Sequence, residues 1–382
     1  MPANLRYEEK YLIEQAVSWL QLNLPETWKA AATSQTVPSQ SPSRPSSTID
    51  AIITITPPHQ GGGANLLVEA KTNFVPRDAE RLFTGMAQQL RLLNSNYPIL
   101  VVAPWLSERA QAVLTKEDIN YLDLTGNVRI ALNYPPLFVT HKGAVRNPAP
   151  SERAPARLKG PKAGRLARFL VDVAPPYGVL QIAEATGLTQ GYTSRLLTSL
   201  DEDALIERAP RGQVQSVDIS EILLRWTQTY DLFKSNQTIS YVAPKGTEDI
   251  LKRLSSLPPS SPLVAVTGSF SAIRYAPVAA PSLLVLYCEE PTILAREFGL
   301  LPSDRGSNVV LLRPFDQVVW ERTTKASGVT YVAVAQTAAD CLTGNGRMPA
   351  EGDALSSWME ANESRWRLSS ISELPDDAKS AT

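Results

Sequence analysis

The chain alternates between stretches with helical periodicity and stretches typical of strands. From residue 5 to 24, apolar residues recur at close to helical spacing until Pro25, which predicts an amphipathic opening helix. The Ser/Pro/Gln-rich stretch 33–47 has almost nothing to bury and is expected to be a loop. Two runs rich in apolar and β-branched residues follow, STIDAIITIT and NLLVEAKTNF, separated by PPHQGGGA. The runs predict two strands joined by a hairpin loop.

The pattern then continues as an α/β domain that ends near residue 141. A helix is expected over 78–94, followed by a buried strand, YPILVVAP. A helix over 107–116 and two short strands, INYLDL and NVRIAL, complete the domain. This order of elements, α, β, β, α, β, α, β, β, is typical of a small α/β domain, which we assign to residues 1–141.

Residues 142–164 are predicted to form a basic linker. Between Lys142 and Arg168 there are eight Lys or Arg residues and one acid, Glu152, in a Pro- and Ala-rich context. A segment of this kind serves either as a solvated tether or as an arm on DNA phosphates, where each cation adds salt-dependent affinity. The domain that follows it decides between these two interpretations.

Residues 165–240 have the pattern of a winged helix-turn-helix. Small residues at 183, 185 and 187 suit the first helix, and Gly191 stands at the entry to the second. The segment ERAPRGQVQSVDI predicts a β-hairpin wing with Arg211 at its tip. The residues expected to contact DNA are polar side chains of the second helix and the wing: Gln190, Tyr192, Thr193, Ser194, Arg195, Arg208, Arg211 and Gln213.

This segment resembles the winged helix-turn-helix of bacterial transcription regulators over about residues 165–230. Many of those regulators have Gly in the turn before the wing, where this chain has Asp203-Ala204. Winged helices also serve as protein–protein modules. The adjoining basic linker favours the DNA-binding interpretation.

The first domain holds a second chemical pattern. Asp50 lies in one predicted strand, and Glu69 and Lys71 lie in the next. Side chains two residues apart on a strand share a face, so hairpin pairing can bring all three together. Two carboxylates and a lysine can bind Mg²⁺ and place a cation beside an attacking water, as phosphodiester hydrolysis requires. The alternative is a surface salt bridge between Glu69 and Lys71 in a fold without catalysis.

Residues 1–141 resemble the restriction-endonuclease-like, or PD-(D/E)XK, nucleases, whose pattern is an acid on one strand and acid-x-Lys on the next. The resemblance implies that Asp50 and Glu69 are metal ligands and that Lys71 orients or activates water. Mg²⁺ is the implied cofactor if the site is active. The pattern's opening proline is replaced by isoleucine. The accessory residues that the resemblance implies are Gln89 and either Glu9 or Glu14.

Residues 241–362 are predicted to form a nucleotidyltransferase-like α/β domain. Gly268-Ser269 after a strand is similar to the nucleotidyltransferases, in which two metal-binding acids follow on one face of the next strand. No acid occurs between Ser269 and Cys288, and the adjacent Glu289 and Glu290 would point to opposite faces of a strand. Transferase activity is therefore not expected. The polar residues 363–382 are expected to be a disordered tail.

Composition narrows the classes of function. Net charge is −1 and the isoelectric point is near 6.2, so a DNA site must be a local patch. Hydrophobic residues make up 43% of the chain, which suits a globular protein. Two cysteines and two histidines are too few for a disulfide framework or a structural zinc site. The charged N-terminus and the absence of a long apolar run lead us to expect a cytoplasmic protein without a membrane partner.

The layout as a whole resembles the abortive-infection (AbiEi-like) antitoxins of bacterial type IV toxin–antitoxin systems, through the segments YLDLTGN, GSNVVLLRP and AQTAADCLTGNGR. The resemblance implies an α/β multidomain repressor of its own operon with a role in phage defence, a homodimer on double-stranded DNA, and a toxin partner. The rival hypothesis is a Mg²⁺-dependent DNA endonuclease that the same winged helix targets. A third hypothesis is a protein adaptor.

Overall fold

The computed structural model describes residues 8–33, 50–58, 62–82, 97–148, 157–258, 261–303 and 305–374. It is a mixed α/β protein with two large mixed β-sheets. The chain divides into two compact units. Unit 1 holds residues 1–155 with the short stretch 200–204, and unit 2 holds residues 156–199 and 205–382. The loop predicted at 33–47 lies outside the described residues except for Thr33, which ends β1.

Unit 1 is built on a mixed sheet. Within the described residues, seven strands follow one another in chain order, and only the β3–β4 and β4–β5 pairs are parallel. The strands are β1 Lys29–Thr33, β2 Ala51–Thr56, β3 Ala64–Ala70, β4 Ile99–Ala103, β5 Asn120–Asp123, β6 Val128–Leu132 and β7 Leu137–His141. The helices are α1 Glu9–Asn23, α2 Pro76–Leu82 and α4 Glu108–Lys116.

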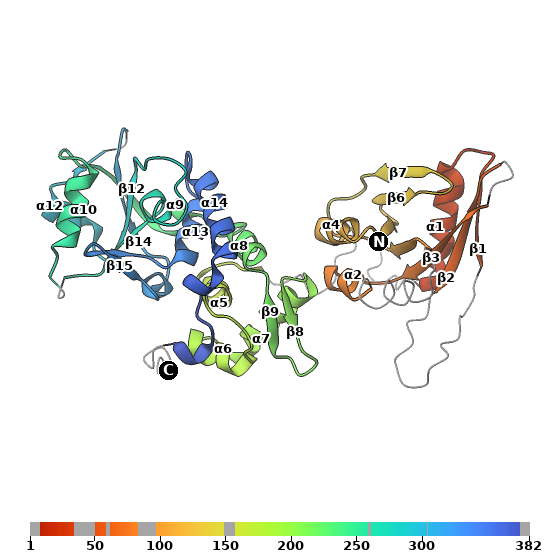
Figure 1. The fold of residues 1–382 in the computed structure, drawn as a ribbon, viewed down its shortest axis with the longest axis horizontal. Coiled ribbons are helices and arrows are strands. Elements are labelled where there is room, and N and C mark those ends of the chain that lie inside the picture. The colour runs from red at the N-terminus through yellow and green to blue at the C-terminus, as the bar shows by residue number, and fades with distance from the viewer. Residues whose placement is uncertain are drawn as a thin grey trace. The chain divides into compact units, whose positions relative to one another are not determined.

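Helices cover both faces of this sheet (Figure 1). Helix α1 buries Leu12, Ala16 and Leu20, spaced by four residues, against one face. Residues of α2 and α4, such as Ala79 and Leu114, form a separate cluster with the odd-numbered positions of β4. Because both faces are covered, β4 is an unbroken apolar run rather than an alternating one.

The expected strands at 47–56 and 65–74 are present as β2 and β3, but β1 and β7 add two strands at the sheet edges that the sequence did not predict. Strand β1 reads KAAAT, and alanine has low strand propensity, so its sequence carries no strand signal. Strand β7 begins after a short turn and exposes most of its side chains. Helix α2 begins at Pro76, and the remainder of the helix expected over 78–94 lies outside the described residues.

The YLDLTGN segment has a structural role. Asp123 is 1% exposed, and its carboxylate accepts hydrogen bonds from the backbone N–H groups of Leu106, Thr125 and Asn127. The Asn127 side chain also donates to the Ala144 carbonyl at 3.2 Å. The segment thereby closes the β5–β6 turn and holds the start of the predicted linker against the sheet.

Unit 2 begins with the predicted winged helix and continues into a second sheet. Its first part comprises α5 Pro161–Asp172, α6 Val179–Thr186, α7 Gln190–Glu202, β8 Ile206–Arg208, β9 Val214–Val217, α8 Ile219–Thr227 and α9 Leu232–Ser235. Its second part has strands β10 Gln237–Val242, β11 Val264–Thr267, β12 Leu284–Cys288, β13 Leu301–Pro302, β14 Val309–Arg313, β15 Thr324–Ala326 and β16 Val329–Tyr331. The second-part helices are α10 Thr247–Ser255, α11 Ser269–Ala272, α12 Pro291–Phe298, η2 Gln317–Trp320, α13 Val334–Leu342, α14 Met348–Ala361, η3 Glu363–Arg365 and η4 Ile371–Glu373.

The second sheet has the strand order β13-β10-β14-β12-β11-β16-β15 in the described part of the chain. Strands β12 and β14 pair in parallel, as do β11 and β16, and the other pairs are antiparallel. The VTYVAVAQTAADCL run divides into a strand and a helix, because its second half supplies small residues that pack at helical spacing. The domain boundary predicted at residue 240 falls inside β10.

Helix α5 and the second sheet, which belong to the same compact unit, share one buried polar network. Arg168 on α5 is 1% exposed and donates to Asp172 at 2.8 Å and to Gln336 on α13 at 2.9 Å. Gln336 in turn donates to Asp340 at 2.8 Å. The Asp340 carboxylate also accepts hydrogen bonds from three hydroxyl groups: Tyr230, Tyr287 and Thr267.

Both ends of unit 2 differ from the sequence prediction. Leu158 is 1% exposed and α5 begins at Pro161, so the expected linker 142–164 includes the start of the folded unit. Arg168, counted among the basic residues of that region, is buried in an ion pair instead of facing solvent. The expected tail from residue 363 is ordered as far as 374, with Trp366 only 9% exposed.

Within the described ranges, no helix is long and apolar enough to cross a membrane.

Asp340 is expected to make the protein less stable as pH rises from about 4 to above 6. Burial raises the pKa of its carboxyl from 3.8 to about 6, although hydrogen bonds from Thr267, Tyr230 and other donors act in the opposite direction. Below about pH 4 both the folded and the unfolded states hold the proton. As pH rises from about 4 to above 6, the unfolded state releases the Asp340 proton before the folded state does, so the free energy of unfolding falls. The shift corresponds to roughly 3 kcal/mol.

Urea denaturation near pH 4 and pH 7 measures this effect. The Asp340→Asn variant, which cannot ionise at this position, should show a smaller loss of unfolding free energy between the two pH values than the unmodified protein. An equal loss in both proteins would show that Asp340 keeps its ordinary pKa.

Candidate functional site

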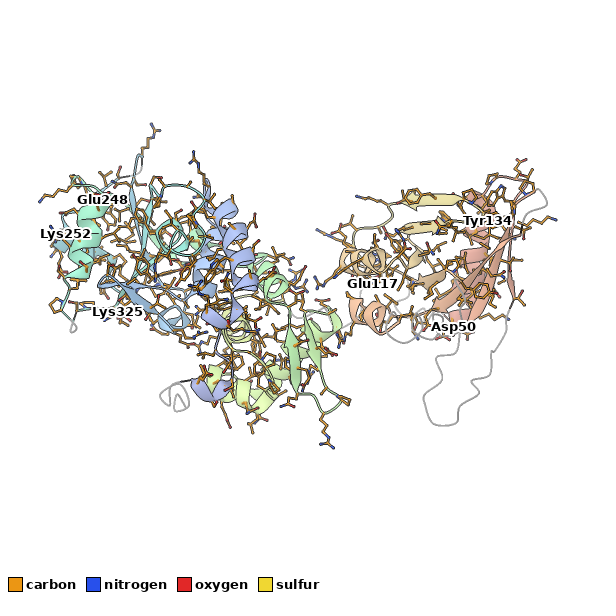
Figure 2. The ribbon with its side chains drawn as sticks, in the orientation of Figure 1. Asp50, Glu117, Tyr134, Glu248, Lys252 and Lys325 are labelled. Atoms are coloured by element: carbon orange, nitrogen blue, oxygen red, sulfur yellow. The ribbon has the colours of Figure 1, made fainter. Side chains whose placement is uncertain are left out.

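The nuclease-like residues meet on one face of the unit 1 sheet. Asp50 directly precedes β2, Glu69 lies in β3, and Lys71 follows the end of β3 (Figure 2 labels Asp50). Ala51 pairs with Val68, so Asp50 stands across from Glu69 as the antiparallel ladder continues. Because side chains alternate along a strand, these three residues share a face, while Ala51 and Val68 enter the core under α1.

Specific contacts hold this cluster in place. The Asp50 Oδ2 atom accepts a hydrogen bond from the backbone N–H of Ala70 at 2.8 Å. The Lys71 Nζ atom lies 2.8 Å from Glu69 Oε1, with the two side chains 41% and 12% exposed. The backbone N–H of Lys71 donates to Val102 of β4. Both neighbouring strands therefore fix the backbone that carries the pair.

The electrostatics of the cluster follow from partial burial and crowding of acids. Burial raises the pKa of Glu69 above its ordinary value, although the Lys71 ammonium opposes this shift. The hydrogen bond with Glu69 raises the pKa of Lys71. Asp50 and Glu9 raise the pKa of both groups further through their negative charges. Three carboxylates therefore influence one ammonium group.

The structure distinguishes between the accessory residues that the resemblance implied. Glu9, at the first position of α1, is close enough to act electrostatically on Glu69 and Lys71. Glu14 is exposed and does not figure among those influences. Gln89 lies outside the described residues.

The described residues hold no group of three or more His, Cys, Asp or Glu side chains arranged around a common metal position. The ligands available here are the two carboxylates of Asp50 and Glu69. This pair fits Mg²⁺, which is commonly bound by one or two carboxylates and keeps several of its own waters.

The predicted helix-turn-helix residues form two consecutive helices in unit 2. Helix α6 ends at Gly187, whose φ of 64° lies in the left-handed region that glycine adopts without strain. Leu188 is buried in the turn, and α7 then begins at Gln190. Ala204, where many regulators have Gly, adopts a left-handed φ of 55°. The backbone of that turn thus keeps the conformation that glycine favours despite the substitution.

Helix α7 separates its predicted DNA-binding residues into two groups. Gln190 and Arg195 are exposed, and Tyr192 and Ser194 are partly exposed. The prediction for Thr193 was wrong, because its side chain is 0% exposed. At helical spacing Thr193 shares a face with the buried Leu196 and Leu197, so it packs inward. Its hydroxyl oxygen is buried without a hydrogen-bond partner in the described structure.

The wing is the β8–β9 hairpin, closed by a turn at residues 209–213. The backbone N–H of Gly212 donates to the Ala209 carbonyl at 2.7 Å, and Gly212 has φ of 82°. Arg211 and Gln213 are exposed on this turn. Arg208 instead donates to the Gly212 carbonyl at 3.1 Å and to the Thr198 hydroxyl of α7 at 3.3 Å. Arg208 therefore joins the wing to the second helix.

Sequence reasoning missed Thr198, which is exposed on the same face of α7 as Arg195 and Gly191. The spacing of three and four residues between these positions was the available signal. It also missed Gln215, an exposed residue of β9 whose amide donates to Gln213 at 3.1 Å.

The Gly268-Ser269 turn of the second sheet is packed inside the protein. Ser269 is 9% exposed and its hydroxyl donates to Glu351 of α14. A Cβ atom at position 268 would lie 2.8 Å from the Met348 side chain. Helix α14 therefore covers this turn, and the following strand β12 carries no acid.

Two comparisons with known proteins found no match to this chain. No protein-family model matches the chain, and no curated protein sequence matches it. The assignment of candidate sites rests on the residues and on their geometry.

Proposed function

We propose that this protein is a sequence-specific DNA-binding regulator of transcription that reads DNA through α7 and its wing. The observation that carries the proposal is a set of exposed polar side chains on α7 and the wing, two elements that the Arg208–Thr198 hydrogen bond joins: Gln190, Arg195, Thr198, Arg211 and Gln213. Such side chains supply hydrogen-bond donors and acceptors to base edges and cations to phosphates.

The bond from Arg208 to Thr198 supports this proposal. A reading helix and a wing bind DNA together at a smaller entropic cost if their relative position is fixed before binding. Arg208 supplies that link, since it contacts the turn of the wing and the exposed face of α7 at once. Because this contact already exists in the free protein, α7 and the wing lose little further conformational entropy when DNA binds.

Cations at the end of the predicted linker are a second part of the proposal. Arg157, Lys159 and Lys162 are exposed where the chain enters α5. They supply phosphate contacts in our proposal, whereas Arg165 and Arg168 do not, because they pair with Asp316 and Asp172. We further propose an antitoxin-like repressor in the cytoplasm that binds as a homodimer and has a toxin partner, as the family resemblance implies.

A second candidate function is Mg²⁺-dependent DNA cleavage by unit 1. The convergence of Asp50, Glu69 and Lys71 on one face, with Glu9 adding negative charge, specifically favours it. In this function Asp50 and Glu69 would hold Mg²⁺, which supplies Lewis-acid activation of water when bound. Lys71 would hold a positive charge beside the attacking water.

Replacing both Arg195 and Arg211 with alanine is expected to weaken binding to DNA from the promoter of the protein's own operon by about tenfold or more. The slope of log binding constant against log salt concentration should also become shallower, by the equivalent of about two phosphate contacts. Fluorescence anisotropy across a salt series measures both quantities. The matched control is Thr193→Val, which removes a buried hydroxyl and keeps the shape, so its DNA affinity should not change. If the double variant and the unmodified protein bind DNA with equal affinity, this surface does not contact DNA.

The nuclease candidate predicts that duplex DNA is cut with Mg²⁺ and remains intact with EDTA. Asp50→Asn and Lys71→Met should each lower the cleavage rate by about a hundredfold or more, while DNA binding stays the same. Glu26→Gln, at an exposed carboxylate of the same unit, serves as the control. If DNA is bound but remains uncut with Mg²⁺, the regulator proposal stands and the nuclease proposal is excluded.

A further inference from the structure

Thr198 is an exposed residue of α7, three positions after Arg195 and seven after Gly191 on the same face of the helix. A threonine side chain carries two chemically different groups on one carbon atom, a hydroxyl group and a methyl group. When the hydroxyl group is held against the protein, the methyl group is the one left to face a ligand. The contacts of Thr198 therefore decide what this residue can recognise.

The hydroxyl group of Thr198 is turned toward the protein by its hydrogen bonds to α7 and to the wing. Its Oγ1 atom donates to the Ser194 carbonyl at 2.9 Å, one turn earlier in α7. The same atom accepts a hydrogen bond from Arg208 Nη1 of β8 at 3.3 Å. A hydroxyl group has a single hydrogen, so the bond to Ser194 uses its whole donor capacity. Thr198 therefore has no donor left for a base.

The methyl group of Thr198 is consequently the part of the side chain that is offered to solvent. The Oγ1 atom is held both at the helix backbone and at the wing, and this fixes the χ1 angle. The Cγ2 atom occupies another staggered position on the same carbon, on the exposed side of the residue. The methyl group is thus presented in one direction before any ligand binds.

Gly191 leaves the same face of α7 open to close approach. It is exposed, and a Cβ atom added there would contact nothing within 4 Å. Packing inside the described protein therefore does not require a glycine at this position, although glycine lowers helix stability relative to alanine. A missing side chain lets the helix backbone come near a groove, and a methyl group, which is short, makes contact only at such close range.

The chemical feature that matches an outward methyl group in the major groove is the C5 methyl group of thymine. The other three bases present only hydrogen-bond donors and acceptors at this edge. A side chain that has spent its donor on its own helix gains little from those groups. It gains apolar contact from the thymine methyl group.

We propose that Thr198 selects thymine through contact between the two methyl groups, and that its hydroxyl group holds the threonine methyl group in place. This inference rests on the proposed function in DNA binding and names the base that one residue of α7 selects. Arg208 is a positioning residue in this scheme, because it acts on the choice of base through Thr198.

Replacement of single thymines by deoxyuridine tests the contact, because this substitution removes only the C5 methyl group. A duplex is first selected for binding to the full chain from a random-sequence pool, and each of its thymines is then replaced in turn. Fluorescence anisotropy should show a thymine position at which uracil weakens binding about threefold, the factor that corresponds to one buried methyl group.

Two variants separate the methyl group from the hydroxyl group. Thr198→Ser keeps the hydroxyl group and should bind the thymine and uracil duplexes equally. Thr198→Val keeps the methyl group and should retain the preference for thymine, although the lost bond from Arg208 weakens binding to both duplexes alike. Thr292→Ser, at an exposed threonine of α12, is the matched control and should behave as the unmodified protein does. Thermal denaturation checks that each variant is folded.

The outcomes distinguish this inference from the proposed function. If no thymine position is sensitive to uracil, or if Thr198→Ser still prefers thymine, the inference is overturned while DNA binding stands. A Thr198→Val variant without the preference would also contradict a methyl contact. If the pool yields no bound duplex, the proposed function fails and this inference fails with it.

Discussion

The architecture of unit 2 depends on the burial of one positive charge. Arg168 lies almost completely out of solvent, and the free energy of removing a guanidinium from water is recovered only if every donor finds a partner. Those partners come from three parts of the chain: Asp172 on the same helix, Gln336 on α13, and backbone carbonyls at 318 and 321. Removing Asp172 would leave a buried charge unpaired, at a cost of about 3–5 kcal/mol.

This requirement explains why helices α5–α8 and the second sheet form a single unit. Gln336 uses its carbonyl for Arg168 and its amide for Asp340, so the charge on α5 is connected to the hydroxyl groups around Asp340. Tyr230, just after α8, and Tyr287 of β12 meet at the same carboxylate. Helix α5 and the second sheet are therefore connected by polar contacts that tolerate little displacement.

Periodicity predicted the parts of the fold where one face is buried and the other is solvated. The opening helix, β2, β3, the two helices of the helix-turn-helix and the wing all follow from it. It could not predict β1, whose alanines carry no strand signal, or the packing of Trp366, which depends on contacts distant in sequence. For the candidate sites, the two-residue spacing of Glu69 and Lys71 correctly placed them on one face. The burial of Thr193 and Arg168 was missed because residue type alone suggests exposure.

The shared network around Arg168 and Asp340 also affects how this protein can evolve. Arg168 is neutralised by Asp172 on its own helix, but it also donates to Gln336, which is encoded more than a hundred residues downstream. A gene fragment that ends before the second sheet would keep Asp172 and lose Gln336 and the carbonyls at 318 and 321, so the buried guanidinium would be incompletely hydrogen-bonded. Helices α5–α8 and the second sheet are therefore expected to be inherited together, with neither exchanged alone.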